Sequence, residues 1–259
     1  MTLLRTFVSL NVAVSEALDR VLPPALRRDG NVDFRAQALP SVLKPGALIY
    51  DLGGGSRPCI SAEEKQRHDQ RVVGLDISAE ELAAAPAGVY DTAIAADLCS
   101  FVGPGDGDVA ICQATLEHVP DTAGAIRAIA SCMAPGGRSA LFAPCRNAVF
   151  ARLNLALPED FKRRMLFAVF PHKAEGHDGF KAYYNRCTPR EIEQLAAANG
   201  LVVEQRRLFW VSSYFKAFVP AFLLWRAWQG VSWLVMRDQA AEAFWYILRK
   251  PLREEAVAA

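Results

Sequence analysis

The stretch "LIYDLGGGSRPCI", residues 48–60, decides the fold that we predict for this chain. A short apolar run ends in Asp51, and Gly53, Gly54 and Gly55 follow almost at once. Glycine adopts positive φ angles and lets the backbone approach another group closely. In an open parallel sheet, ligands bind beyond the carboxyl ends of the strands. The stretch therefore predicts a buried strand that leads into a ligand-binding turn.

The same residues disfavour a dinucleotide site. A G-x-G-x-x-G fingerprint read from Gly53 would need a small residue at its sixth position, where Pro58 stands. A pyrophosphate is also a poor neighbour for the Asp51 carboxylate, which suits a ligand with a positive centre or an ammonium group. A nicotinamide-dependent oxidoreductase is thus the disfavoured alternative. A non-catalytic Rossmann-like scaffold stays open as a second one.

Strand-like and helix-like segments alternate along the chain. The expected strands cover residues 47–52, 71–76, 91–97, 107–114, 138–144, 201–210 and 243–251. The expected helices cover residues 61–70, 78–85, 122–134 and 188–200, and glycine in "APGG" is expected to cap the third of them. Alternation at this spacing predicts an α/β fold with a parallel sheet covered on both faces.

Five segments in this order carry a family resemblance. "YDLGGGSRP" is followed by "VVGLDIS", "AIAADL", "DVAICQATLEHV" and "MAPGGRSALFAP". Together they resemble the class I S-adenosylmethionine-dependent methyltransferases, over residues 40–210 and the closing strand. The resemblance implies a Rossmann-like, doubly wound, mostly parallel seven-stranded sheet with an antiparallel last strand and helical insertions. It also implies a methyltransferase with S-adenosyl-L-methionine as cofactor. The scattered cysteines, without a partnering histidine, predict no metal site.

The resemblance assigns the cofactor-binding residues to the strand ends. Asp51 and the glycines would hold the methionine part, Asp76 the ribose, and Asp97 with Leu98 the adenine, while Gln113 would face the methionine end. The full set is Asp51, Gly53, Gly54, Gly55, Asp76, Ile77, Asp97, Leu98 and Gln113. Taken singly, Asp76 also fits a helix cap and Asp97 a loop acid. The role of Arg57 is left open.

On the acceptor side, the candidates are titratable and aromatic side chains. His118 in "TLEHV" is a candidate for the catalytic base, because a hydroxyl acceptor needs a base within hydrogen-bond reach. The insertion at 146–187 contributes the substrate-side candidates His172, His177, Tyr183 and Tyr184. A structural role for His118, and surface histidines in the insertion, are the alternatives.

Composition narrows the class of partner. The formal net charge of the 259 residues is +1, which gives no reason to expect nucleic acid. The six cysteines form no metal-binding pattern and indicate buried free thiols in a reducing compartment. Residues 1–22 have helical spacing and polar interruptions, so we expect an amphipathic opening helix rather than a signal peptide. These features predict a cytoplasmic protein.

Aromatic residues concentrate near the end of the chain. All five tryptophans lie between residues 208 and 248, around an insert at 211–241. Tryptophan mixed with Lys and Arg is typical of a helix in the membrane interface; a helix packed on the core, a homodimer interface and an apolar acceptor tunnel are the alternatives. The expected acceptor is a small molecule, a lipid or a lipid-linked saccharide, met at the inner face of a membrane.

We therefore predict a single methyltransferase domain. Its parts are an N-terminal helical region at 1–40, a cofactor-binding core at 41–145, the acceptor-side insertion at 146–187 and a C-terminal part at 188–259.

Overall fold

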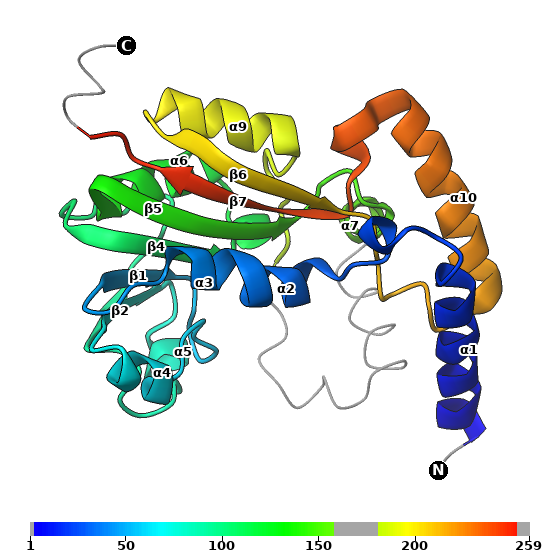
Figure 1. The fold of residues 1–259 in the computed structure, drawn as a ribbon, viewed down its shortest axis with the longest axis horizontal. Helices are drawn as coiled ribbons and strands as arrows, with labels where there is room; N and C mark the ends of the chain where they lie inside the picture. The colour runs from blue at the N-terminus through cyan, green and yellow to red at the C-terminus, as the bar shows by residue number, and fades with distance from the viewer. Residues whose placement is uncertain (1–2, 158–180, 253–259) are drawn as a thin grey trace.

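A computed structural model of the chain describes residues 3–157 and 181–252. The centre is one seven-stranded sheet in the order β3-β2-β1-β4-β5-β7-β6 (Figure 1). Its strands are β1 Leu48–Leu52, β2 Arg71–Asp76, β3 Thr92–Ala95, β4 Gly107–Gln113, β5 Met133–Pro144, β6 Val202–Phe209 and β7 Ala243–Arg249. Only β7 runs antiparallel to its neighbours β5 and β6. The predicted fold class is confirmed.

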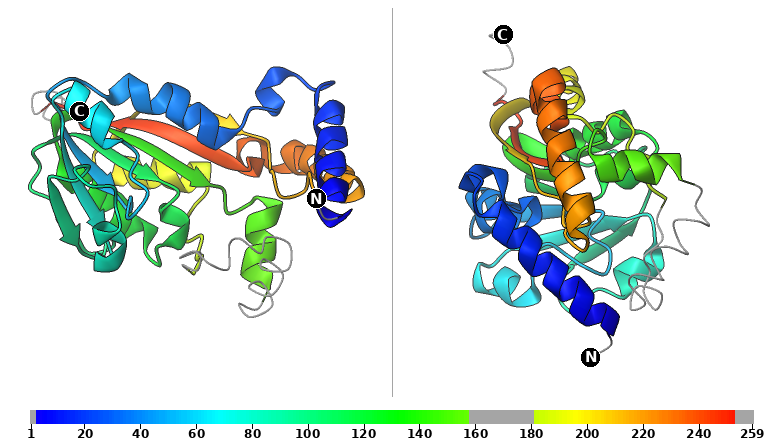
Figure 2. Two further views of the ribbon diagram at one scale, coloured as in Figure 1. Left: turned by 90° about the horizontal axis from the view of Figure 1, so that it is seen from below. Right: turned by 90° about the vertical axis from the view of Figure 1, so that its right-hand side faces the viewer.

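Helices cover both faces of this sheet, as the two turned views show (Figure 2). On one face, α6 (Thr122–Cys132) and α9 (Pro189–Ala198) supply buried residues such as Ile126 and Ile192. On the other face, the run formed by α2 (Gly30–Asp33), the π-helical turn η2 (Phe34–Ala38) and α3 (Leu39–Val42) buries Phe34 and Val42. The middle of β4 is buried, as expected for a central parallel strand.

Local sequence signals set most of the helix ends. The Thr188 hydroxyl caps α9 by accepting from the Glu191 N–H, Pro189 occupies the first turn, and Gly200 follows with φ +70°. Ser61 and Ser78 cap α4 (Ala62–Arg67) and α5 (Ala79–Ala83) in the same way. These short helices follow β1 and β2 in the chain, and α5 begins three residues after β2 ends.

The expected glycine cap of the third helix was wrong. Helix α6 ends at Cys132, and Met133 already has the extended conformation of β5. The "APGG" residues belong to β5, where the Gly136 N–H donates to the Lys250 carbonyl at 2.8 Å. Gly136 has φ +82°, so it allows β5 to bend beside the end of β7 and does not cap a helix.

The remaining helices lie beyond the edge at which the parallel strands end (Figure 1). They are α1 (Leu3–Asp19), α7 (Val149–Ala156) and the long α10 (Val219–Met236); the short turns η1 (Pro24–Leu26), η3 (Leu116–His118) and η5 (Arg237–Ala240) complete the described elements. Within residues 3–157 and 181–252, no helix is both long enough and apolar enough to cross a membrane. His172 and His177 lie outside the described residues.

Candidate active site

Strand register brings the predicted cofactor residues to one edge of the sheet. Asp51 of β1 pairs with Gly74 of β2 and with Ile111 of β4. Asp76, the last residue of β2, pairs with Ala95. Gln113 ends β4. Because these neighbouring strands are parallel, their final side chains gather at the same edge, where Asp97 follows β3 by two residues.

The turn after β1 requires glycine at two positions. Gly53 has φ +80°, and a Cβ placed there would lie 2.3 Å from the Thr115 side chain. A Cβ on Gly54 would lie 2.6 Å from both the Asp51 Oδ2 and the Tyr90 hydroxyl. These are steric collisions, so the backbone takes this path only without side chains. The glycine turn is therefore wrapped closely around the Asp51 carboxylate.

Asp51 is a buried carboxylate with one oxygen left over. Its side chain is 1% exposed, and Oδ2 accepts from the Cys59 N–H at 2.9 Å. Oδ1 has no hydrogen-bond partner among the described residues. Burial raises the pKa of Asp51 to about 6, against the opposing effect of the Cys59 N–H. A buried, unpaired carboxylate oxygen is costly on its own and favours a cationic or N–H donor as its partner.

Asp76 is more accessible and lies beside the same turn. Its Oδ1 accepts from the Ser78 N–H at 3.0 Å, while Ser78 itself caps α5. A Cβ on Gly55 would lie 3.1 Å from the other oxygen, so the glycine turn passes directly beside it. Burial raises the pKa of Asp76. The next residue, Ile77, is 66% exposed and offers an apolar surface at the strand end.

The third acid and its neighbour differ in exposure. Asp97 is exposed, and its Oδ1 accepts from the Cys99 N–H at 2.8 Å, which fixes the local turn. Leu98 is buried, with 6% of its surface exposed. The Asp97 carboxylate therefore faces solvent at the rim of the site, and Leu98 anchors the segment in the core.

Gln113 joins the glycine turn to the N-terminal region. Its amide nitrogen donates to the Asn31 Oδ1, and its Oε1 accepts from the Cys59 thiol at 3.2 Å. Asn31 belongs to α2, more than eighty positions earlier in the chain. Gln113 thus ties α2 to the segment that also holds Asp51.

The acceptor-side candidates assemble around Glu117. The His118 Nδ1 lies 3.2 Å from the Lys181 carbonyl oxygen, and its Nε2 lies 4.0 Å from the Glu117 carboxylate. The Glu117 carbonyl accepts from the N–H groups of Tyr183 and Tyr184 at 2.7 and 3.0 Å. Tyr183 is exposed, whereas Tyr184 is 3% exposed. The structure therefore brings His118 and both tyrosines together.

Sequence reasoning passed over Glu117. The side chain is buried, its Oε2 has no hydrogen-bond partner among the described residues, and burial raises its pKa to about 8. Glu117 is therefore largely protonated near neutral pH.

Three other residues of the site were also missed. The Tyr90 hydroxyl donates to the Gly55 carbonyl at 3.1 Å, and its ring lies where a side chain on Gly74 would be. Thr115 packs against Gly53, and Asn31 binds Gln113. The one available signal was Gly74 inside an apolar strand, because such a glycine marks a close approach by another group.

Comparison with known proteins decides the family. A sequence profile described as methyltransferase domain matches residues 25–206. The chain belongs to this methyltransferase family. The predicted resemblance to class I S-adenosylmethionine-dependent methyltransferases is confirmed, and S-adenosylmethionine is the cofactor of the domain.

The matches between this methyltransferase and its curated relatives extend over only part of each relative. A ubiquinone biosynthesis O-methyltransferase of Aeromonas salmonicida is 30% identical over 165 residues, which are 61% of this chain and 64% of the relative. One of Ralstonia nicotianae is 38% identical over 100 residues, which are 36% of this chain and 41% of the relative. The chain thus spans less than two thirds of these relatives.

Solved structures share the fold at low identity. An S-adenosylmethionine-dependent methyltransferase of Mesorhizobium loti has a TM-score of 0.53 at 19% identity, covering 83% of this chain and 97% of its own. Geranyl diphosphate C-methyltransferase of Streptomyces coelicolor, solved with Mg²⁺, geranyl diphosphate and S-adenosylhomocysteine, has a TM-score of 0.53 at 12% identity, covering 83% and 79%.

The residues present fit this cofactor. The Asp51 Oδ1, which has no partner in the part of the chain that the structure describes, matches an ammonium or sulfonium centre. The accessible Asp76 carboxylate has the chemistry to accept hydrogen bonds from a pair of hydroxyl groups. Gly55 keeps the backbone of the turn free of a side chain beside the Asp76 carboxylate.

Proposed function

We propose that this protein transfers a methyl group from S-adenosylmethionine to a small-molecule acceptor. The observation that carries the proposal is the Asp51 carboxylate, buried inside the glycine turn with Oδ1 unpartnered among the described residues. Asp51 and the glycine turn would hold the methionine part, Asp76 and Ile77 the ribose side, and Asp97 and Leu98 the adenine side. Gln113 would border the methionine end.

When bound, the cofactor supplies an activated methyl group, so the residues of the chain mainly have to align the acceptor and exclude water. For a hydroxyl acceptor, we propose His118 as the base. Its Nδ1–H would donate to the Lys181 carbonyl at 3.2 Å, which leaves Nε2 free of a proton. Glu117, protonated near neutral pH, would then lie 4.0 Å from Nε2 as a neutral acid, so that no carboxylate charge stands beside the base. The named O-methyltransferase relatives support an oxygen acceptor.

The finer part of the proposal concerns where the acceptor resides. We propose a lipid or lipid-linked acceptor, reached by peripheral association with the inner face of a membrane. The exposed apolar residues of α10, such as Leu224 and Trp228, support this location. Free thiols at all six cysteines support the reducing, cytoplasmic side.

Methyl transfer is tested by incubating the protein with S-adenosylmethionine and phenols that do or do not carry a prenyl tail. Mass spectrometry follows the methylated product, and S-adenosylhomocysteine release follows turnover. We expect product from the tailed phenols, and a His118→Gln variant with lower kcat but unchanged affinity for S-adenosylhomocysteine. Cofactor binding without turnover of any phenol would contradict the phenolic oxygen acceptor, and absence of cofactor binding would contradict the function itself.

A further inference from the structure

Helix α10 is arranged inside out with respect to water. Its polar side chains are Arg226, Gln229 and Ser232, and all three face inward or into contacts with the rest of the chain. Its exposed positions hold only apolar residues and glycine. Leu224 is 74% exposed, Trp228 50% and Val235 79%. An exposed helix face of this kind normally marks a docking surface.

Helix α1 also carries exposed apolar side chains, alongside exposed polar ones such as Arg5 and Glu16. Phe7, Leu10 and Val14 recur at helical spacing and are 51%, 64% and 40% exposed. The face that docks on the α10 segment is polar instead. Its buried Ser15 hydroxyl donates to the Lys216 carbonyl at 3.1 Å, and the Asn11 side chain accepts from the Val219 N–H at 3.0 Å.

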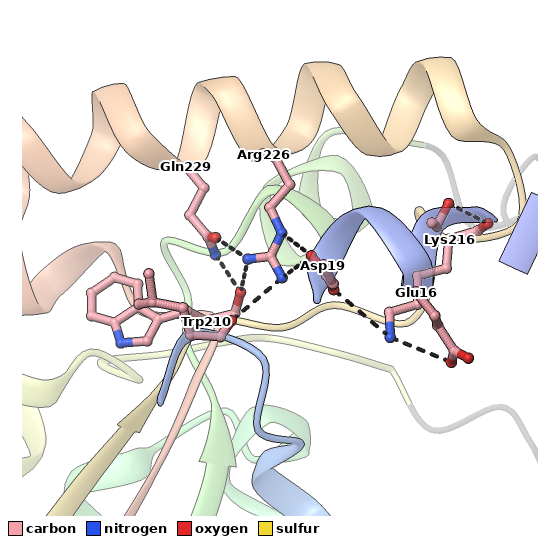
Figure 3. Close-up of polar contacts among 8 residues, drawn as sticks. Glu16, Asp19, Trp210, Lys216, Arg226 and Gln229 are labelled. Atoms are coloured by element: carbon pink, nitrogen blue, oxygen red, sulfur yellow. Dashed lines mark hydrogen bonds and ion pairs between the residues drawn. The ribbon is translucent and has the colours of Figure 1, made fainter. Parts of the chain in front are cut away.

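A buried charge pair fastens the two helices together (Figure 3). The Arg226 guanidinium donates to the Asp19 Oδ1 at 2.9 Å, to the Trp210 carbonyl at 2.7 Å and to the Gln229 Oε1 at 2.7 Å. The side chains of Asp19 and Arg226 are 5% and 13% exposed. Polar groups thus hold α1 to α10. Phe222 and Trp225 of α10 are buried, but the other large apolar side chains named above, on both helices, are exposed.

Charge distinguishes a lipid surface from a second copy of the chain. Residues 3–28 and 211–240 together hold seven basic and three acidic side chains, whereas the whole chain has a net charge of +1. The three acids form ion pairs, Glu16 with Lys216, Asp19 with Arg226 and Asp238 with Arg206. Two such positive surfaces repel each other, but an anionic bilayer attracts them.

The aromatic residues support the same occupant. Trp233 is exposed and stacks under the Arg237 guanidinium at 4.5 Å, at the end of α10. Tryptophan and arginine together are typical of the boundary between lipid headgroups and acyl chains.

We propose that α1 and α10 form one bilayer-docking unit, held together by the Asp19–Arg226 pair and inserted side-on into the interface of an anionic membrane. The inference rests on the proposed function in that it gives the lipid acceptor a surface from which to enter. The unit lies beyond the edge where the parallel strands end, so docking turns that edge towards the bilayer (Figure 1). Helix α1, which carried no functional prediction, is half of this unit.

The test is sedimentation of the full chain with vesicles of phosphatidylcholine and phosphatidylglycerol in equal parts. Three double variants are compared with the wild type. The first carries Phe7→Ser and Leu10→Ser on α1, the second Leu224→Ser and Val235→Ser on α10, and the control Val102→Ser and Val202→Ser. The control residues are also exposed, at 77% and 45%, but lie away from both helices. Each double substitution on a helix should lower the vesicle partition coefficient about tenfold or more, and the control double substitution should leave it unchanged.

Three results would overturn the proposal. The first is a wild type that stays in the supernatant. The second is loss of binding on changing α10 but not α1. The third is a wild-type dimer in analytical ultracentrifugation that the helix variants convert to monomers, which would make the surface an interface between copies. Titration of the wild type and each variant with S-adenosylhomocysteine separates this proposal from the proposed function. Vesicle binding without cofactor binding would contradict the proposed methyl transfer and leave the membrane-docking proposal standing.

Discussion

The ionisation of Asp51 gives the sharpest prediction for cofactor binding. Burial raises its pKa to about 6 in the free protein. A ligand with a cationic centre beside Oδ1 needs the ionised form, so binding below pH 6 must first remove a proton. The perturbation is therefore a change of pH from 7 to 5, a range in which the amino group of S-adenosylhomocysteine stays protonated.

The magnitude follows from this pKa. Roughly nine tenths of Asp51 is ionised at pH 7 and about one tenth at pH 5, so the Kd for S-adenosylhomocysteine should rise about tenfold, or ~1.4 kcal/mol. The free energy of unfolding of the ligand-free protein should change in the opposite sense, because protonated Asp51 favours the folded state at low pH. A raised pKa means that the contribution of Asp51 is fully present below pH 3.8 and lost as pH rises through about 6, by up to ~3 kcal/mol.

Isothermal titration calorimetry at pH 5, 6 and 7 measures the first effect, and urea unfolding without ligand measures the second. Asp51→Asn, which keeps the shape but not the charge, should bind more weakly at pH 7 and lose most of the pH dependence. A Kd that is constant from pH 5 to 7 in the wild type, or an equal pH dependence in the variant, would refute the role of Asp51.

Three further substitutions, the last with a matched control, test the cofactor site, the buried acid and the contact between α1 and α10. Asp76→Ala should weaken S-adenosylhomocysteine binding by about 1.5–3 kcal/mol, the scale of hydrogen bonds to a charged group, and calorimetry with unchanged affinity would remove Asp76 from the site. Glu117 has its pKa raised by burial from 4.5 to about 8, so its contribution to stability is lost as pH rises through that range. The wild type should therefore lose up to ~4 kcal/mol of unfolding free energy, relative to Glu117→Gln, as pH rises from 5 to 9 in urea unfolding. A difference between the two proteins that stays constant with pH would contradict a buried neutral acid at this position. Asp19→Ala leaves the Arg226 charge buried without its carboxylate and should lower the free energy of unfolding by about 3 kcal/mol, while Glu63→Ala, at an exposed ion pair, should change it by less than about 1 kcal/mol. Similar losses in both variants would argue against the charge pair as the link between α1 and α10.

The sequence was sufficient for the sheet and for the strand-end acids. Strand alternation and the glycine turn are local signals, and parallel register then brings Asp51 and Asp76 together without further information. Tyr90 and Asn31 were not predictable in this way. Both reach the site through tertiary packing, Tyr90 beneath Gly74 and Asn31 against Gln113, and neither has a motif around it.

The aromatic segment shows the same boundary between local and tertiary information. Its composition predicted an interfacial helix, a core helix, a dimer interface or an apolar acceptor tunnel, and α10 combines inward and outward aromatic residues. Trp225 is buried, with its indole N–H donating to Glu242 at 2.9 Å, whereas Trp228 is exposed. Which face of such a helix docks depends on its partners. Here the decisive partner, Asp19, lies more than two hundred positions away in the sequence.

The central claim is that the glycine turn and the acids around it bind S-adenosylmethionine rather than a dinucleotide. The most direct measurement is calorimetric titration of the full chain with S-adenosylhomocysteine at pH 7, with NAD as the control. The account predicts saturable binding of S-adenosylhomocysteine with a Kd in the micromolar range and no heat of binding for NAD. Binding of NAD, or of neither ligand, would contradict it.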